Sequence, residues 1–155
     1  MNMKRRTFLR SSAAASAVGV AVGAGLLSPQ AVLAAWPKKA FEAESLDGAM
    51  EALTGKTKTS EGDIQIKAPD IAENGAVVPV TVSAEMDGAE SIAIFAAKNA
   101  NPLTSDWKLG PGAKPFVSTR IKMGETSDVV AVVNAGGKLY SARKEVKVTI
   151  GGCGG

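Results

Sequence analysis

The sequence predicts an all-β protein, an immunoglobulin-like antiparallel β-sandwich with a short N-terminal helix and a flexible Gly-rich C-terminal arm. Six or seven short segments have strand character, turn residues separate them, and no long helical pattern interrupts them. Hydrophobic residues make up 45% of the 155-residue chain, a composition typical of a globular domain. A disulfide-stapled sandwich is excluded, because the single cysteine cannot form a bridge within the chain.

Residues 38–53 are expected to form the helix. Four apolar residues recur at roughly helical spacing along it: Phe41, Leu46, Met50 and Leu53. Gly55 follows directly and is expected to end the helix, because glycine readily takes the left-handed conformation of a helix C-terminus.

After the helix, the sequence pattern changes to that of strands. The expected strands in this part are residues 63–67, 77–82, 91–96 and 116–122. Pro79 has no backbone N–H to donate, so we expect it at a sheet edge or at the start of a strand. Residues 99–115 contain three prolines and two glycines and are expected to form a loop.

The most distinct feature of the mature chain is a β-hairpin. Residues 128–133 and 138–143 are its expected strands, and Asn134-Ala135-Gly136-Gly137 is the turn between them. The two glycines can supply the positive φ angles that a tight turn needs. Residues 145–150 alternate strictly and are expected to form a last strand that closes the domain.

Residues 1–34 are expected to be an export signal. Arg5 and Arg6 precede Thr7-Phe8-Leu9, which resembles the twin-arginine motif, and a mild apolar stretch and small residues follow up to Ala35. The signal predicts a periplasmic protein cleaved near Ala35. A transmembrane anchor is the alternative, but the apolar stretch is shorter than the about 20 residues that span a bilayer, so we expect no membrane association after cleavage.

The basic charge of the chain belongs to this leader. Four of the 18 basic residues lie in the first ten positions, and no acidic residue precedes Glu42. The remainder has 14 basic and 15 acidic residues. We therefore expect no nucleic-acid partner, because nucleic-acid binding proteins carry clustered positive charge.

The residue inventory excludes most catalytic and metal chemistry. The chain has no histidine and one cysteine, so a Ser-His-Asp triad, a Cys/His zinc site and a haem or iron–sulfur ligand set are excluded. We expect no metal and no cofactor. Twin-arginine substrates cross the membrane folded, usually because they carry a cofactor or a bound partner. Because this chain can hardly hold a metal cofactor of its own, we expect a partner subunit to be bound before export.

The end of the chain contains its only thiol. Cys153 is flanked by Gly151, Gly152, Gly154 and Gly155, and glycine loses more conformational entropy on ordering than any other residue, so we expect a mobile arm over residues 151–155. Two plainer interpretations remain open here: an incidental cysteine in a frayed terminus, or a cysteine that forms only an interchain disulfide. A thiol peroxidase is disfavoured, because no cation in the arm would activate the thiol.

The segment from Glu125 to Gly155, with its final Gly-Gly-Cys-Gly-Gly, resembles the SoxY family, the sulfur-carrier subunits of the periplasmic thiosulfate-oxidising (Sox) system. The leader and the sandwich prediction also agree with this family. The resemblance implies that thiosulfate is coupled oxidatively to Cys153. It further implies that other enzymes then release sulfate, oxidise the remaining sulfane sulfur and release a second sulfate.

The resemblance also implies the partners and a non-enzymatic role. They are a SoxZ-like subunit in a heterodimer, a c-type cytochrome, a sulfate-releasing hydrolase and a sulfane dehydrogenase. On this interpretation, residues 1–34 are the signal peptide, residues 35–150 the carrier domain and residues 151–155 the arm. The rival interpretation is a periplasmic binding or adhesion sandwich whose cysteine forms only an interchain disulfide.

Overall fold

A computed structural model of the chain describes residues 36–150, so the predicted export signal and the predicted arm lie outside the described residues. In chain order the elements are α2 (Lys38–Phe41), α3 (Leu46–Thr54), β1 (Ser60–Glu61), β2 (Ile64–Lys67), β3 (Ile71–Ala72), β4 (Val78–Ala84), β5 (Ala89–Ala96), β6 (Leu103–Lys108), β7 (Phe116–Ile121), β8 (Ser127–Ala135) and β9 (Lys138–Val148). Within residues 36–150, neither α2 nor α3 is long and apolar enough to cross a membrane.

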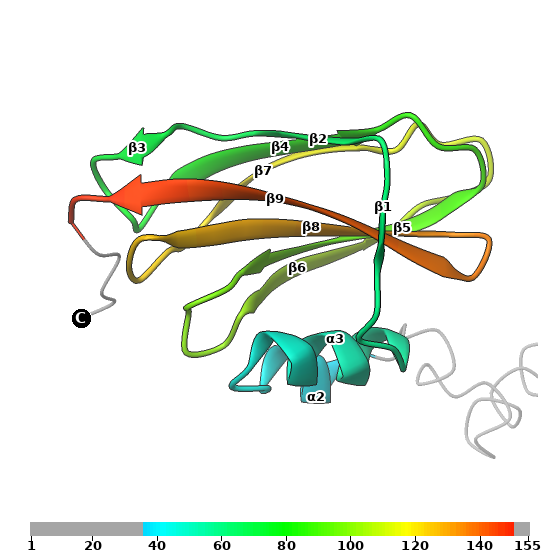
Figure 1. Cartoon of the computed structure of the whole chain (residues 1–155), viewed down its shortest axis with the longest axis horizontal. Helices are drawn as coiled ribbons and strands as arrows, with labels where there is room; N and C mark the ends of the chain where they lie inside the picture. The colour runs from blue at the N-terminus through cyan, green and yellow to red at the C-terminus, as the bar shows by residue number, and fades with distance from the viewer. Residues whose placement is uncertain (1–35, 151–155) are drawn as a thin grey trace, which may run out of the picture. The chain divides into compact units, whose positions relative to one another are not determined.

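Two sheets form the predicted β-sandwich (Figure 1). The larger sheet has the order β1-β9-β8-β5-β6, and β3 also pairs with β9; the smaller sheet has the order β2-β4-β7. The short strands β1 and β3 run parallel to β9, and the other pairs are antiparallel. The sandwich prediction is therefore confirmed, with two short parallel additions to β9.

The main core lies between the two sheets, where apolar side chains from both inner faces pack together. The smaller sheet contributes alternate residues of β4, and the larger sheet contributes alternate residues of β5 and β8. These residues include Val78, Val80, Val82, Ile92, Ile94, Val129, Ala131 and Val133. The period of two follows from strand geometry, because successive side chains point to opposite faces.

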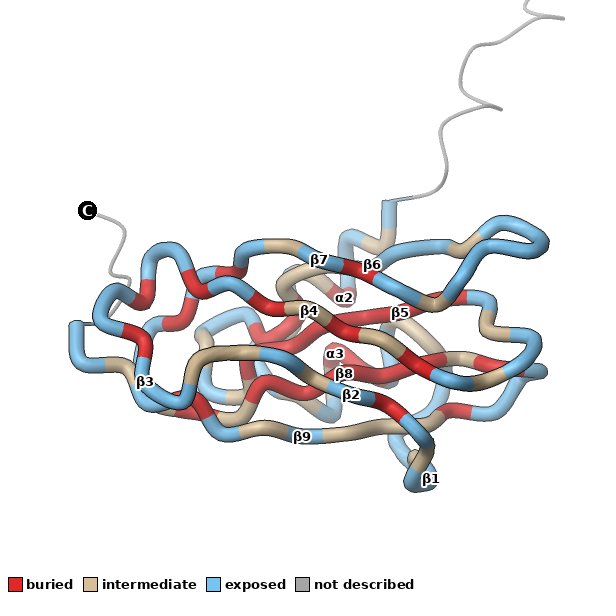
Figure 2. The backbone as a smooth tube through the Cα atoms, turned by 90° about the horizontal axis from the view of Figure 1, so that it is seen from above, coloured by how far each residue is buried: buried red, intermediate tan, exposed pale blue. Residues whose placement is uncertain are grey.

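A second core cluster covers the other face of the larger sheet. The two helices lie against this face (Figure 1), and Ala49 and Met50 of α3 share a buried cluster with Phe95, Val130 and Val132. The central strands β5 and β8 are therefore buried on both faces, as Figure 2 shows in red. This explains why β8 is continuously apolar over residues 129–133, a pattern typical of strands covered on both sides.

The predicted single helix over residues 38–53 is wrong in one respect, because the segment forms two helices. Helix α2 ends at Phe41, and α3 begins at Leu46 after the N-cap Ser45, whose hydroxyl accepts a hydrogen bond from the backbone N–H of Gly48 (3.1 Å). The predicted stop is confirmed: Gly55 has a φ of 71° and caps α3 in the left-handed conformation.

The prediction of an unbroken loop over residues 99–115 is also wrong. Residues Leu103–Lys108 form β6, an edge strand that pairs with β5. Leu103 is buried, whereas the end of the strand is exposed. The strand exists because its backbone completes the edge of the larger sheet, although its sequence has little apolar alternation.

The predicted hairpin is confirmed, but both of its strands are longer and its turn is shorter than expected, because Asn134 and Ala135 belong to β8. Gly136 and Gly137 form the turn with φ angles of 56° and 74°. The two strands predicted over residues 138–143 and 145–150 are one continuous strand, β9, which ends at Val148 rather than at Ile150. Strand β8 pairs with β9 from Ala135 opposite Lys138 to Ser127 opposite Val146.

Pro79 lies near the start of β4, as expected. Strand β2 pairs with β4 only from Thr81 onward. At Pro79, β4 therefore has a strand partner on one side only, which is β7, where Pro79 lies opposite Arg120. The absent N–H of proline is tolerated where a strand has a partner on one side only.

Candidate functional site: the root of the cysteine arm

Cys153 and the glycines Gly151, Gly152, Gly154 and Gly155 lie outside the described residues, as do Arg5 and Arg6. The described chain ends at Ile150, three residues before the cysteine. The part of the candidate site that the structure describes is the root of the arm. We define the root as the last residues of β9 up to Ile150, together with the segments that bind them.

Residues 70–75, which include strand β3, bind one side of this root. The end of β9 makes three backbone hydrogen bonds there: Lys147 N to Asp70 O (3.0 Å), Thr149 N to Ala72 O (3.1 Å) and Gly75 N to Ile150 O (2.8 Å). The Thr149 hydroxyl also donates to the carbonyl of Glu73 (3.1 Å). Residues 70–75 therefore hold the main chain as far as Ile150, two residues beyond the end of β9.

Thr126 binds the other side of the root. Because alternate N–H groups of a strand point to opposite sides, the N–H of Val148 points away from β3, where those of Lys147 and Thr149 are bound. Strand β8 begins only at Ser127, opposite Val146, so it offers no strand residue opposite Val148. The Thr126 side-chain oxygen accepts the hydrogen bond from Val148 N instead (2.9 Å).

A turn at Asn74 and Gly75 connects this arrangement to the rest of the sandwich. The Asn74 side-chain oxygen accepts a hydrogen bond from Ala76 N (2.8 Å), which closes an Asx-type turn. The Gly75 carbonyl accepts from Met123 N (2.7 Å), and Met123 is fully buried in the core between the sheets. We refer to residues 70–75 together with Thr126 as the root clamp.

The charges beside the root clamp are of both signs. Asp70 forms an ion pair with Lys144 (3.1 Å), and its carboxylate is largely exposed. Glu73 and Lys147 are also exposed on these segments. The charges of these four groups sum to zero.

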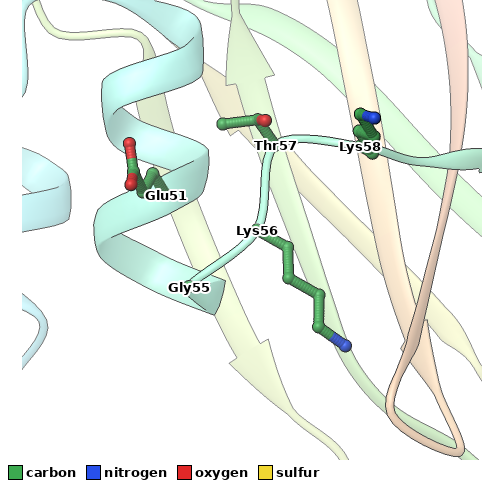
Figure 3. A pocket seen from close by; sticks show the side chains of 5 residues that line it. All are labelled: Glu51, Gly55, Lys56, Thr57 and Lys58. Carbon is green, nitrogen blue, oxygen red and sulfur yellow. The ribbon is translucent and has the colours of Figure 1, made fainter.

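The pocket in Figure 3 lies at the opposite end of β9. Its lining residues are Glu51, Gly55, Lys56, Thr57 and Lys58, at the end of α3 and in the segment that follows. The Lys56 ammonium donates to the carbonyl of Gly137 (2.7 Å), at the turn before β9. The eleven residues of β9 separate this turn from the root by about 35 Å at the usual rise of a strand, so the pocket is not part of the root.

The part of the chain that the structure describes offers no centre for metal chemistry. Within residues 36–150, no group of three or more His, Cys, Asp or Glu side chains is placed to hold a metal ion. The root of the arm is therefore distinguished by its hydrogen bonds and not by a cluster of reactive side chains.

Comparison with known protein families identifies the chain. The family model described as "Sulfur oxidation protein SoxY" matches residues 50–153, a range that includes Cys153. The chain belongs to the SoxY family. It is also similar to the solved structure of the sulfur carrier protein SoxY from Chlorobium limicola f. thiosulfatophilum, with 50% sequence identity and a TM-score of 0.63.

That likeness covers 68% of this chain and 97% of the Chlorobium SoxY chain. It confirms the predicted resemblance and the predicted immunoglobulin-like β-sandwich class. No curated protein matches the chain. Membership of the SoxY family gives this chain a role in sulfur oxidation.

The root clamp is the part of the site that the sequence pattern does not predict. Pro69 indicates the end of a strand, and no periodicity follows it over residues 70–76. The Asn74-Gly75 pair is a common turn signal and indicates a turn at this position. The pairing of β3 with β9 has no such local signal, because it joins segments about 75 residues apart.

Proposed function

We propose that this SoxY-family chain is a covalent carrier of sulfur substrates rather than an enzyme. Cys153 would hold thiosulfate-derived intermediates and present them to the enzymes of periplasmic thiosulfate oxidation. The observation that carries the proposal is the family match through residue 153, which includes the only cysteine of the chain. The similarity to the Chlorobium relative, a sulfur carrier protein, supports the same function.

The proposed loading step forms a sulfur–sulfur bond. The Cys153 thiolate and the outer sulfur of thiosulfate join to give a cysteine S-thiosulfonate, and an electron pair passes to a c-type cytochrome. A hydrolase then uses water to release the terminal sulfone as sulfate, and a persulfide remains on the cysteine. A sulfane dehydrogenase then oxidises that outer sulfur to a sulfonate: three water molecules supply the oxygen atoms, six protons are released, and six electrons pass one at a time to a c-type cytochrome. A second hydrolysis releases sulfate and regenerates the thiol.

The root clamp supports a carrier role, because it holds the main chain up to Ile150 by hydrogen bonds on both sides. A carrier needs a fixed point from which its cysteine is offered to different enzymes. A SoxZ-like subunit would be the constant partner. We propose that the protein reaches the periplasm by the twin-arginine route with this partner already bound.

Intact-mass spectrometry tests the covalent step. The full heterodimer, purified without reducing agent, is incubated with thiosulfate and the c-type cytochrome, and its mass is compared with that of a Cys153→Ser control. We expect the unmodified chain to gain one thiosulfonate or sulfane adducts, and the control to gain none. A disulfide-linked dimer as the only modified species would instead support the binding or adhesion alternative, and the same adduct on the control would contradict the assignment of Cys153.

A further inference from the structure

We propose that Asn74 is a deamidation site that the root clamp protects. The side-chain amide of Asn74 is converted to a carboxylate when the hydrogen bond from Gly75 N to the Ile150 carbonyl (2.8 Å) opens. The co-reactant is water, and no enzyme takes part. The inference concerns the chemistry of the folded chain and does not depend on the proposed carrier function.

The reaction is an internal substitution followed by hydrolysis. The main-chain nitrogen of Gly75 loses its proton and attacks the side-chain carbonyl carbon of Asn74. A carbon–nitrogen bond forms, the bond to the side-chain nitrogen breaks, and that nitrogen leaves as ammonia with the proton from Gly75. Water then opens the cyclic imide at either carbonyl, which gives aspartate or isoaspartate. A water molecule is consumed, ammonia is released, and no electrons are transferred.

The sequence favours this reaction at one asparagine. Five asparagines occur in the chain, and only Asn74 is followed by glycine. Asn99 and Asn134 precede alanine, and Asn101 precedes proline, which has no N–H that could become the nucleophile. Glycine has no Cβ atom beside the attacking nitrogen and allows the backbone rotation that ring closure needs.

The fold presents the Asn74 amide for attack. The residue is exposed, so water reaches its side chain. Its side-chain oxygen accepts a hydrogen bond from Ala76 N (2.8 Å). This bond holds the amide beside the main chain that follows, as in other Asx turns, and withdraws electron density from the carbonyl carbon. The electrophile of the reaction is therefore in place.

The nucleophile, in contrast, is engaged elsewhere. Gly75 is buried, its N–H donates to the Ile150 carbonyl (2.8 Å), and its own carbonyl accepts from Met123 N (2.7 Å). A buried N–H that is bound to a carbonyl is kept from solvent base. The two bonds also fix the backbone of Gly75, so it cannot rotate toward the Asn74 side chain while both are made.

Thr149 supports this protection from the other strand. Its N–H donates to the Ala72 carbonyl (3.1 Å), and its hydroxyl donates to the carbonyl of Glu73 (3.1 Å), the residue before Asn74. These bonds lie next to the bond between Gly75 and Ile150. We therefore expect that bond to open together with its neighbours, by local unfolding of the end of the chain.

Deamidation would weaken the root clamp permanently. In isoaspartate the main chain runs through the side-chain carbonyl, which adds a carbon atom to the chain before Gly75 and moves Gly75 relative to Ile150. Both products also carry a new carboxylate next to the exposed Glu73. We expect the amides of Gly75 and Thr149 to exchange their hydrogens faster in the modified chain.

The test measures the rate of deamidation in the full heterodimer, incubated in mildly alkaline buffer. Deletion of residues 149–155 removes the Ile150 carbonyl, whereas deletion of residues 151–155 is the matched control that keeps Ile150. Peptide mapping by mass spectrometry measures aspartate and isoaspartate at Asn74. The same chain unfolded in urea gives the rate without protection.

Two point variants complete the set. Thr149→Val keeps the chain length and removes the hydroxyl that binds Glu73. Gly137→Ala introduces strain at a residue with a φ of 74° at the opposite end of β9, and leaves the root clamp intact. It therefore separates local opening at the clamp from a general loss of stability.

We expect deletion of residues 149–155 to raise the rate at Asn74 about three- to tenfold, the factor that follows from the loss of one typical hydrogen bond. Urea should raise it further, and Thr149→Val should raise it less. Deletion of residues 151–155 and Gly137→Ala should leave the rate unchanged. Asn99 and Asn134, measured in the same samples, should stay unmodified in the folded protein.

Each contrary result overturns a stated part of the proposal. Equal rates in the folded and unfolded chains would overturn the protection, and no reaction at Asn74 in urea would overturn the site itself. An equal increase in Gly137→Ala would assign the reaction to global unfolding. If the longer deletion melts below Gly137→Ala, Thr149→Val decides, and an unchanged rate in that variant overturns the protection. Sulfur uptake is measured separately, so the carrier function stands in all these cases.

Discussion

Gly136 and Gly137 show how strongly one turn depends on its residue type. Both have positive φ, 56° and 74°, in the turn between β8 and β9. A Cβ atom at either position would meet no other atom within 4 Å, so crowding does not explain the need for glycine. The requirement is conformational, because L-residues with a side chain rarely adopt this backbone geometry.

Replacing Gly137 with alanine should therefore destabilise the protein through backbone strain alone. We expect Gly137→Ala to lower the free energy of unfolding by about 1–2 kcal/mol, the usual penalty for a left-handed residue with a Cβ atom. Gly110→Ala is the matched control, because Gly110 also has open space around it but has no positive φ. Urea unfolding of both variants measures the difference, and an equal loss in both would contradict the explanation.

At the level of elements, the end of β9 depends on a side chain that takes the place of a strand. Val148 N donates to the Thr126 side-chain oxygen (2.9 Å), because β8 begins only at Ser127 and offers no strand residue there. Thr126→Val should leave this partly buried N–H without its acceptor. We expect the free energy of unfolding to fall by about 1–2 kcal/mol and the Val148 amide to exchange its hydrogen faster.

Ser118→Ala is the control for that variant. It removes another side-chain hydrogen bond, between Ser118 and Thr81 (3.0 Å), on the exposed face of the smaller sheet. We expect it to change the free energy of unfolding by less than about 0.5 kcal/mol, as is usual for surface substitutions. Unchanged exchange at Val148 in Thr126→Val would show that the threonine does not hold the end of β9.

The elements also show which features the sequence determines locally. The β8–β9 hairpin and the stop at Gly55 were predictable, because a glycine pair and a helix-ending glycine act within a few residues. The break in the helix had a local signal too, the N-cap Ser45. Strand β6 had almost none, because an edge strand of mixed polarity is defined by its pairing with β5.

The same distinction applies to the candidate site. Cys153 and its flanking glycines are evident from the sequence, whereas the root clamp depends on the parallel pairing of Ile71 with Lys147 and on the Thr126 hydroxyl. Both are long-range contacts that no periodicity encodes. Sequence thus indicates the proposed reactive group, and the fold determines where the main chain before it is held.

At the scale of the whole molecule, we expect the constant partner to bind the sandwich rather than the arm. Deletion of residues 151–155 should therefore abolish sulfur uptake and leave the heterodimer with the SoxZ-like subunit intact. A sizing column and intact-mass spectrometry measure the two properties on the same sample. Cys153→Ser serves as the control that keeps the arm, and dissociation of the heterodimer only in the deletion variant would place the interface at the arm.

Export is the second expectation at this scale. The double variant Arg5→Lys, Arg6→Lys keeps the charge of the leader but removes the arginine pair on which the twin-arginine interpretation rests. We expect the protein to accumulate in the cytoplasm as the uncleaved precursor, which cell fractionation and immunoblotting detect. Normal periplasmic levels of the double variant would contradict this route.

The root clamp also has a kinetic consequence. By binding the main chain up to Ile150, it limits the tether between the domain and the thiol to three residues. In a docked complex, such a short tether gives the thiol an effective concentration in the millimolar range or above at the receiving centre. Weak docking is then sufficient for transfer, and weak docking permits rapid release. A carrier that must leave one enzyme with its sulfur still attached and reach the next therefore benefits from a short arm more than from a tight interface.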